Sequence, residues 1–302
     1  MVKARFLTIL FTVLVLSCQS GRDHDKTISE FEPADSVIQE DPSVISDEVV
    51  WDIIYNFSSI VEIPAFMKDI GVPYYNGFIS AADHIDNYDD NFRKAFLAGV
   101  LGSDIGYMNM YNRTADIPRY LTALRQLTDS LVPENIFDFN NMERLAGSES
   151  DQGSFTYSYM QSYNRMDEYL RQESMTHLST AMVSGVWLEG LYLLTRASGL
   201  HPDNEIHERI GEQKIILNDL VIILRSHERS HPEFAGLTGQ MSSIKEEFDQ
   251  VEIVYEVDEP QAVERDGMLV IVQNQRSTVN IEDRQIENIT RKAETIRNNL
   301  IL

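Results

Sequence analysis

Cysteine and basic residues are scarce in this sequence. Among 302 residues there is one cysteine, Cys18, and 25 lysines and arginines stand against 48 aspartates and glutamates. A single cysteine excludes an intrachain disulfide framework. The formal net charge of −23 repels phosphate backbones and anionic membrane surfaces, so nucleic acid is not an expected partner.

The first 18 residues have the pattern of a bacterial export signal. Lys3 and Arg5 precede an apolar run over residues 6–16, which is too short for a permanent span, since that needs about 20 apolar residues. The run continues into Ser17 and Cys18 and resembles the lipobox of bacterial lipoproteins. An ordinary secretory signal with an incidental cysteine is the alternative.

The lipobox resemblance implies a cleaved signal peptide over residues 1–17 and lipid on Cys18. Two or three acyl chains, such as palmitate, anchor a protein stably, whereas one chain is marginal. Gln19 follows the cysteine, and the lack of aspartate there favours the outer membrane, facing the periplasm or the exterior. We therefore expect a cell-envelope lipoprotein that meets the membrane through its N-terminal lipid.

Residues 18–46 are polar and acidic and contain Pro33 and Pro42, with no sustained apolar period. Mutual repulsion of their carboxylates should keep this segment extended. Cleavage would also remove Lys3 and Arg5, which takes the formal charge from −23 to −25. We expect a flexible acidic tether over residues 18–46, followed by a folded helical domain over residues 47–302.

Apolar residues in the folded region recur at spacings of three and four, which is typical of amphipathic helices. The pattern predicts a capped helix after Ser46, a short helix from Pro64 to Gly71, and longer helices at about 87–112, 117–131, 155–173, 175–198, 204–226, 232–249 and 281–300. Valine- and isoleucine-rich runs at 251–257 and 268–273 predict the two strands of a β-hairpin over about 251–273. The expected fold is therefore a mainly α multi-helix bundle with a small C-terminal β-hairpin and a terminal helix.

Two of these helices contain glycines inside a helical pattern. Residues 99–107 read GVLGSDIGY and residues 185–192 read GVWLEGLY, each with an acid followed three residues later by a tyrosine. An internal helical duplication would leave such a repeat. A glycine inside a helix costs about 1 kcal/mol relative to alanine, and small residues allow two helix backbones to approach closely. We expect these two helices to be central and to cross each other.

The acids of these helices, Asp104 and Glu189, stand beside Tyr107, Trp187 and Tyr192 in apolar surroundings. One interpretation is a pair of carboxylates in a cleft, for acid–base chemistry or metal binding. The other is a buried polar cluster in which the acids are satisfied by hydroxyls, the indole or helix N-termini. The second is favoured, because neither of these two helices contains the Glu-x-x-His pattern of metal-binding bundles.

Residues 227–231 read HERSH, which matches the zinc-peptidase pattern H-E-x-x-H. In that pattern His227 and His231 would hold the metal. Arg229 would place a cation among the ligands, and Pro232 breaks the helix that must carry both histidines. We therefore expect no metal and no other cofactor, and keep His227 and His231 as weak zinc candidates.

Four segments carry a resemblance to a known family. They are residues 96–107 (FLAGVLGSDIGY), 167–170 (DEYL), 185–192 (GVWLEGLY) and 296–299 (IRNN). Together they resemble an uncharacterised family of all-helical lipoproteins of Bacteroidetes-type bacteria, over most of residues 50–302. Leu101 and Ser103 depart mildly from the tyrosine and alanine typical of that family. The resemblance implies a fold and a compartment but no activity.

The sequence contains no nucleophile elbow, P-loop or dinucleotide-binding glycine pattern at a strand–helix junction. This favours a binding module over an enzyme, with an envelope protein or another envelope component as partner. One alternative is a hydrolase that uses metal or the carboxylates of Asp104 and Glu189. Another is a small-ligand binder with a pocket between the two glycine-containing helices.

Overall fold

The structure is a computed structural model that describes residues 61–80, 82, 90–146, 151–257, 261–265, 268–272 and 275–301. The chain divides into two units, Met1–Gln39 and Glu40–Leu302, and the described residues belong to the second. The expected signal peptide, Cys18, the acidic tether and the helix after Ser46 lie outside the described residues.

The described part of the second unit is mainly helical, and the predicted fold class is confirmed. Its α-helices are α2 (Glu62–Asp69), α3 (Asn91–Met110), α4 (Ile117–Thr128), α5 (Phe139–Ala146), α6 (Gln152–Gln172), α7 (Thr176–Leu200), α8 (Asn204–His227), α9 (Phe234–Phe248) and α10 (Asp283–Ile301). A short 3-10 helix, η1 (Asn76–Phe78), lies between α2 and α3.

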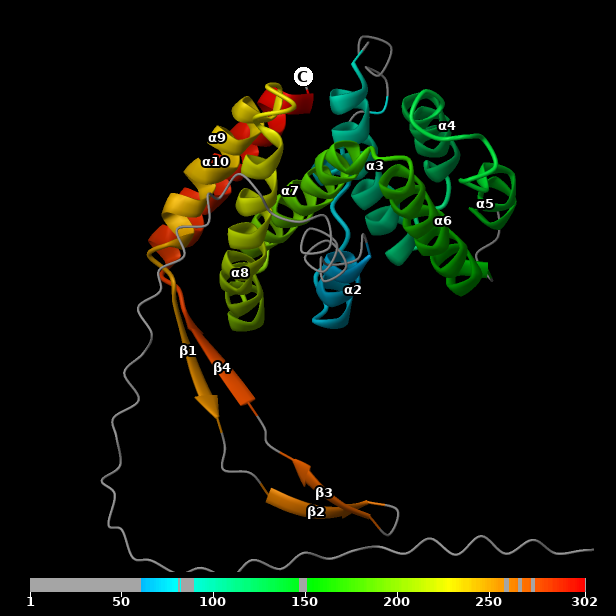
Figure 1. The fold of residues 1–302 in the computed structure, drawn as a ribbon. Coiled ribbons are helices and arrows are strands. Elements are labelled where there is room, and N and C mark those ends of the chain that lie inside the picture. Colours follow the sequence, from blue (N-terminus) through cyan, green and yellow to red (C-terminus); the bar gives the residue numbers. More distant parts are fainter. Residues whose placement is uncertain are drawn as a thin grey trace, which may run out of the picture. The chain divides into compact units, whose positions relative to one another are not determined.

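Helices α3 and α7 form the centre of the bundle (Figure 1). Helices α4, α5 and α6 pack on one side of this pair, and α8, α9 and α10 pack on the other. Both central helices are buried almost all round, as expected for helices that are apolar on every face. The apolar part of α7 is long enough to cross a membrane, but 89% of that window is buried inside the bundle, which identifies α7 as a core helix.

Glycine is required where α3 and α7 cross. A Cβ atom on Gly99 would collide with the carbonyl oxygen of Met182 and lie 2.8 Å from the backbone nitrogen of Val186. A Cβ atom on Gly185 would collide in turn with the carbonyl oxygen of Phe96. The two backbones are therefore in direct contact, and the predicted close crossing of these helices is confirmed.

Helix α5 was not predicted from the sequence. It is only eight residues long and packs Phe139, Met142 and Leu145 into the core, against α4 and α6. So short a helix is marginal in isolation, since most helical stability in proteins comes from tertiary packing. Its apolar pattern therefore gave too weak a signal to identify the helix.

The β-hairpin is longer than the sequence predicts. Strand β1 (Glu252–Val257) pairs antiparallel with β4 (Gln275–Asn280), and β2 (Gln261–Arg265) pairs with β3 (Met268–Val272). The predicted partner of the first strand was the run that forms β3. Strand β4 reads QRSTVN and lacks the apolar alternation that marks a strand. Its pairing depends on backbone register, from Glu252 opposite Asn280 to Val257 opposite Gln275.

Candidate functional site

Asp104 of α3 and Glu189 of α7 lie together in the core, and Arg297 of α10 joins them. Both acids are 0% exposed, and Arg297 is 6% exposed. Arg297 donates two hydrogen bonds to Glu189, from Nε to Oε2 over 2.6 Å and from Nη2 to Oε1 over 2.7 Å. This two-pronged geometry is the strong form of an arginine–carboxylate pair. The acids are therefore closed off from solvent and do not face a cleft.

Ser80 links Asp104 to Arg297. Its backbone N–H donates to Asp104 Oδ2 over 2.9 Å, and its hydroxyl accepts from Arg297 Nη2 over 2.7 Å. The carbonyl of Ser80 accepts a hydrogen bond from the Tyr120 hydroxyl, and the Phe78 carbonyl accepts from Arg297 Nη2 over 3.2 Å. The end of η1 and the loop after it therefore supply most of the polar groups that close this cluster.

Asp104 is placed to hold a proton. Burial, and then the negative charge of Glu189, raise the pKa of Asp104 well above its ordinary value, although Arg297 and the Ser80 N–H oppose this. Its Oδ1 atom is buried, and no donor among the described residues reaches it. A charged oxygen left in that state is strongly disfavoured, whereas a protonated Asp104 would donate its hydrogen to the neighbouring carboxylate of Glu189. The cluster is then neutral, with Glu189 balancing Arg297.

We expect Asp104→Asn to stabilise the fold increasingly as the pH rises. A raised pKa means that the folded state retains the proton longer than the unfolded state, so wild-type stability is lost as the pH rises from about 4 towards the folded pKa. An asparagine amide mimics the protonated acid. The gain should grow by up to about 1.4 kcal/mol per pH unit in that interval.

Urea unfolding of both proteins at pH 5, 6, 7 and 8 measures this gain. Asp69→Asn, at an exposed aspartate at the end of α2, is the control and should follow the wild-type profile. Parallel pH profiles for Asp104→Asn and wild type would show that Asp104 is ionised in the folded protein.

The aromatic residues named with the acids have different surroundings. The ring of Tyr192 lies beneath the guanidinium of Arg297, 4.0 Å from Cζ to the ring centroid. The hydroxyl of Tyr107 accepts a hydrogen bond from the backbone N–H of Tyr75 over 2.9 Å. The indole nitrogen of Trp187 is buried without a partner among the described residues. Of the three, Tyr192 joins the cluster directly.

The H-E-x-x-H segment does not form one helical face. Helix α8 ends at His227, whose Nε2 lies 3.0 Å from the hydroxyl of Thr180. His231 follows in the connection to α9, and its ring stacks on His177 with centroids 3.8 Å apart. The described residues contain no group of three or more histidines, cysteines or acids arranged to hold a metal ion. The spacing of this segment is therefore accounted for by a helix end and a new helix start.

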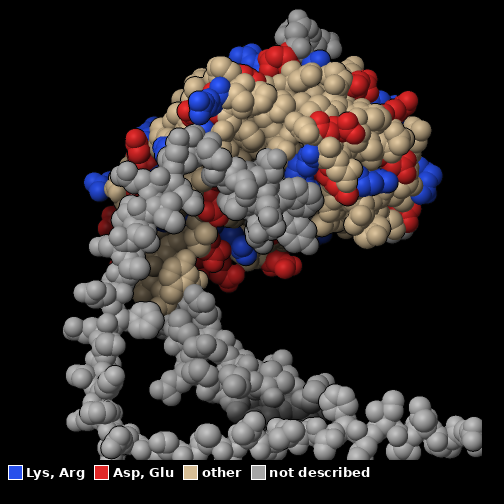
Figure 2. Space-filling view, in the orientation of Figure 1, with Lys and Arg blue, Asp and Glu red and all other residues tan. Residues whose placement is uncertain are grey.

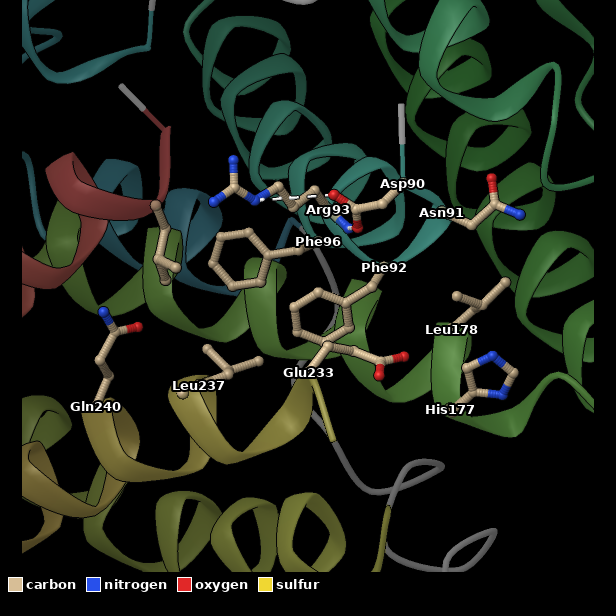
Figure 3. Close-up of a pocket in the computed structure, with 12 residues that line it drawn as sticks. Asp90, Asn91, Phe92, Arg93, Phe96, His177, Leu178, Glu233, Leu237 and Gln240 are labelled. Carbon is tan, nitrogen blue, oxygen red and sulfur yellow. Dashed lines mark hydrogen bonds and ion pairs between the residues drawn. The ribbon is translucent and has the colours of Figure 1, made fainter. Parts of the chain in front are cut away.

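A cavity of about 600 Å³ lies where α3, α7 and α9 begin (Figure 3). Its apolar lining comes from Phe92, Phe96, Leu178, Leu237 and Leu300. Polar side chains around it are Asp90, Asn91, Arg93, His177, Glu233 and Gln240. A volume of this order and an apolar lining with a few polar groups are typical of small-molecule sites, which span about 300–1,000 Å³.

Two further cavities in the described part of the chain differ in character. One of about 780 Å³ lies along α5 and α6, and one of about 460 Å³ lies near the start of α5. Both are lined mainly by polar and charged side chains such as Asn141, Arg165 and Asp138. The pocket formed by α3, α7 and α9, which we call the α3/α7/α9 pocket, is therefore the best candidate site.

Comparison with protein-family models, with the curated proteins and with the solved structures found no match to this chain. The resemblance to helical lipoproteins therefore remains a prediction. The function of the protein is therefore inferred from the geometry of the site.

Two features of the site were not predicted. Arg297 was not identified as a partner of the acids, although it follows Ile296 on the buried side of α10, in step with Ile289 and Ala293. A cation in an apolar stripe indicates a buried acid, because a buried charge is normally paired. The α3/α7/α9 pocket was expected only in general terms, as a space between the two glycine-containing helices, and α9 also contributes to it.

Proposed function

We propose that this protein is a lipid-anchored binding protein of the cell envelope and that it holds a small apolar ligand in the α3/α7/α9 pocket. The lipobox-like segment ending at Cys18 and the acidic stretch behind it support the anchor and the tether. The observation that carries the binding role is the pocket itself, with Phe92, Phe96 and Leu237 lining its interior.

The buried acids support binding over catalysis. Asp104 and Glu189 are sealed from solvent and engaged by Ser80 and Arg297, so a substrate has no access to them. They also lie outside the lining of the α3/α7/α9 pocket. A carboxylate-based hydrolase would need at least one of these acids within hydrogen-bond reach of its substrate.

The exposed surface favours an enclosed ligand over a broad protein interface. The large exposed hydrophobic side chains of the described residues are distributed over α6, α7, α8 and β1. They are Tyr157, Leu200, Ile215, Ile222, Val254 and Tyr255. Acidic and basic side chains are interspersed with uncharged ones on the helical face seen in Figure 2. Single exposed apolar residues are normal on soluble proteins and do not mark an interface.

The neutral fluorescent probe N-phenyl-1-naphthylamine tests this proposal. We expect wild-type protein to bind it saturably, because its apolar rings fit the lining of the pocket. Gly236 lines the pocket, and a Cβ atom added to it would have nothing within 4 Å, so Gly236→Trp should fill the cavity and reduce probe binding at least about tenfold.

Gly239→Trp is the matched control. Gly239 lies on the same helix, also has nothing within 4 Å of a Cβ position, and does not line the pocket. It should bind the probe as wild type does. Equal binding by wild type and both variants, or no binding by the wild type, would contradict the proposed site.

A further inference from the structure

One polar atom in the α3/α7/α9 pocket lacks a partner. The side-chain oxygen of Gln240, Oε1, is buried, and none of the described residues donates a hydrogen bond to it. Leaving a buried acceptor without a donor destabilises the protein, and this cost exceeds the stability that one ordinary hydrogen bond contributes. Because the Gln240 side chain lines the pocket and is itself partly exposed, a turn of its amide would present this acceptor to a ligand N–H or O–H group.

The charges around the pocket favour a cation. Asp90 and Glu233 contribute two carboxylates, and Arg93 contributes the one guanidinium among the lining residues. Arg93 Nε lies 3.8 Å from Asp90 Oδ2, so these two charges offset each other. Glu233 Oε1 lies 3.5 Å from Nδ1 of His231, which balances its charge only when that imidazole is protonated. Burial, and then the neighbouring His231, lower the pKa of His177, so His177 adds no positive charge at neutral pH. With both histidines neutral, the lining carries one net negative charge, that of Glu233.

Aromatic rings line the same pocket as these acids. Phe92 and Phe96 project into it from successive turns of α3 (Figure 3). The face of an aromatic ring attracts an ammonium group and also packs against an apolar body. The strongly acidic chain, with a formal charge of −23, would further raise the local concentration of cations.

The starts of α3, α7 and α9 also meet at this pocket, and helix starts carry partial positive charge that favours anions. An acid stands at two of them. Asp90 caps α3 by accepting a hydrogen bond from the Arg93 N–H over 2.7 Å, and Glu233 is the N-cap residue of α9, where its side chain makes no capping hydrogen bond. These carboxylates offset the attraction that an anionic ligand would otherwise find there.

We infer that the ligand of the α3/α7/α9 pocket is an amine with an apolar body, bound as its ammonium ion. Its N–H groups would meet the Glu233 carboxylate and, once the Gln240 amide has turned, Gln240 Oε1, while its apolar part would lie against Phe92 and Phe96. The inference rests on the proposed function, because it names the chemical class of ligand for the same pocket.

Three matched probes test this class by isothermal titration calorimetry at pH 7. They are 4-phenylbutylamine, 4-phenylbutan-1-ol and 4-phenylbutyrate, which share one apolar body and differ in the head group. We expect the amine to bind at least about tenfold more tightly than the carboxylate, with the alcohol between them. Equal affinities, or tighter binding of the carboxylate, would overturn the inference.

Two variants locate the head group. Gln240→Leu should weaken amine binding about three- to tenfold, the loss of one hydrogen bond. Glu233→Gln should weaken it about two- to fivefold, as for a partly exposed ion pair, and leave the alcohol unaffected. Glu246→Gln, at an exposed acid further along α9, is the control and should bind the amine as wild type does.

The two proposals fail in different ways. If N-phenyl-1-naphthylamine binds in a Gly236-dependent manner but the amine shows no preference over the carboxylate, the pocket stands and the ammonium class is wrong. If the amine binds equally well to Gly236→Trp, it does not occupy this pocket. If none of the three probes binds while the naphthylamine does, the amine inference is overturned and the pocket remains.

Discussion

Arg297→Met is expected to lower the free energy of unfolding by about 3–5 kcal/mol, because it leaves the charged Glu189 in the core without its cation. Glu189 is 0% exposed and loses both hydrogen bonds from the guanidinium. Ser80 loses the same donor. Urea unfolding of the full chain measures the difference. Arg291→Met, at an exposed position of the same helix, should change stability by less than about 0.5 kcal/mol.

A double variant shows whether Arg297→Met destabilises the protein through the buried charge of Glu189 or through lost packing. Removal of both partners, in Glu189→Met with Arg297→Met, should leave the protein more stable than Arg297→Met alone, because no unpaired charge remains. If Arg297→Met stays within about 1 kcal/mol of wild type, or if the double variant is no more stable than Arg297→Met alone, the Arg297–Glu189 pair does not stabilise the core.

Gly99→Ala is expected to destabilise the protein by at least about 3 kcal/mol, at the upper end of overpacking effects. The new Cβ atom would meet backbone rather than a flexible side chain: the Met182 carbonyl, and the Val186 nitrogen at 2.8 Å. Helices α3 and α7 would have to separate, and the contacts across the centre of the bundle would loosen.

Gly199→Ala in α7 is the matched control for this change. Its Cβ position has nothing within 4 Å, so alanine there should leave stability unchanged or raise it by up to about 1 kcal/mol. Thermal and urea unfolding of both variants provide the comparison. A Gly99→Ala variant as stable as wild type would show that the two backbones are not in direct contact.

The central helices were predictable because their sequences are locally unusual. Gly99 and Gly185 interrupt apolar helical patterns, and such glycines are retained only where close packing offsets their cost. The hairpin partner of β1 was harder to predict, because β4 is polar and the neighbouring apolar run forms β3. Apolar periodicity identifies elements that bury one face, and it says little about strands paired mainly through their backbone.

The site was predictable only in part. Asp104 and Glu189 were identified as a pair because each stands in an apolar helix. Their partner Arg297 is 108 residues away from Glu189, and only the packing of α10 against α7 brings it to them. The α3/α7/α9 pocket likewise combines the starts of three helices far apart in the chain, so no local pattern marks it.

The most direct test of the account compares Asp104→Asn and Gly236→Trp in one binding experiment. If the buried acids Asp104 and Glu189 are structural and the ligand occupies the α3/α7/α9 pocket, only the second variant affects binding. Titration with N-phenyl-1-naphthylamine should therefore give wild-type affinity for Asp104→Asn and at least about tenfold weaker binding for Gly236→Trp. Loss of binding in Asp104→Asn together with wild-type affinity in Gly236→Trp would contradict it.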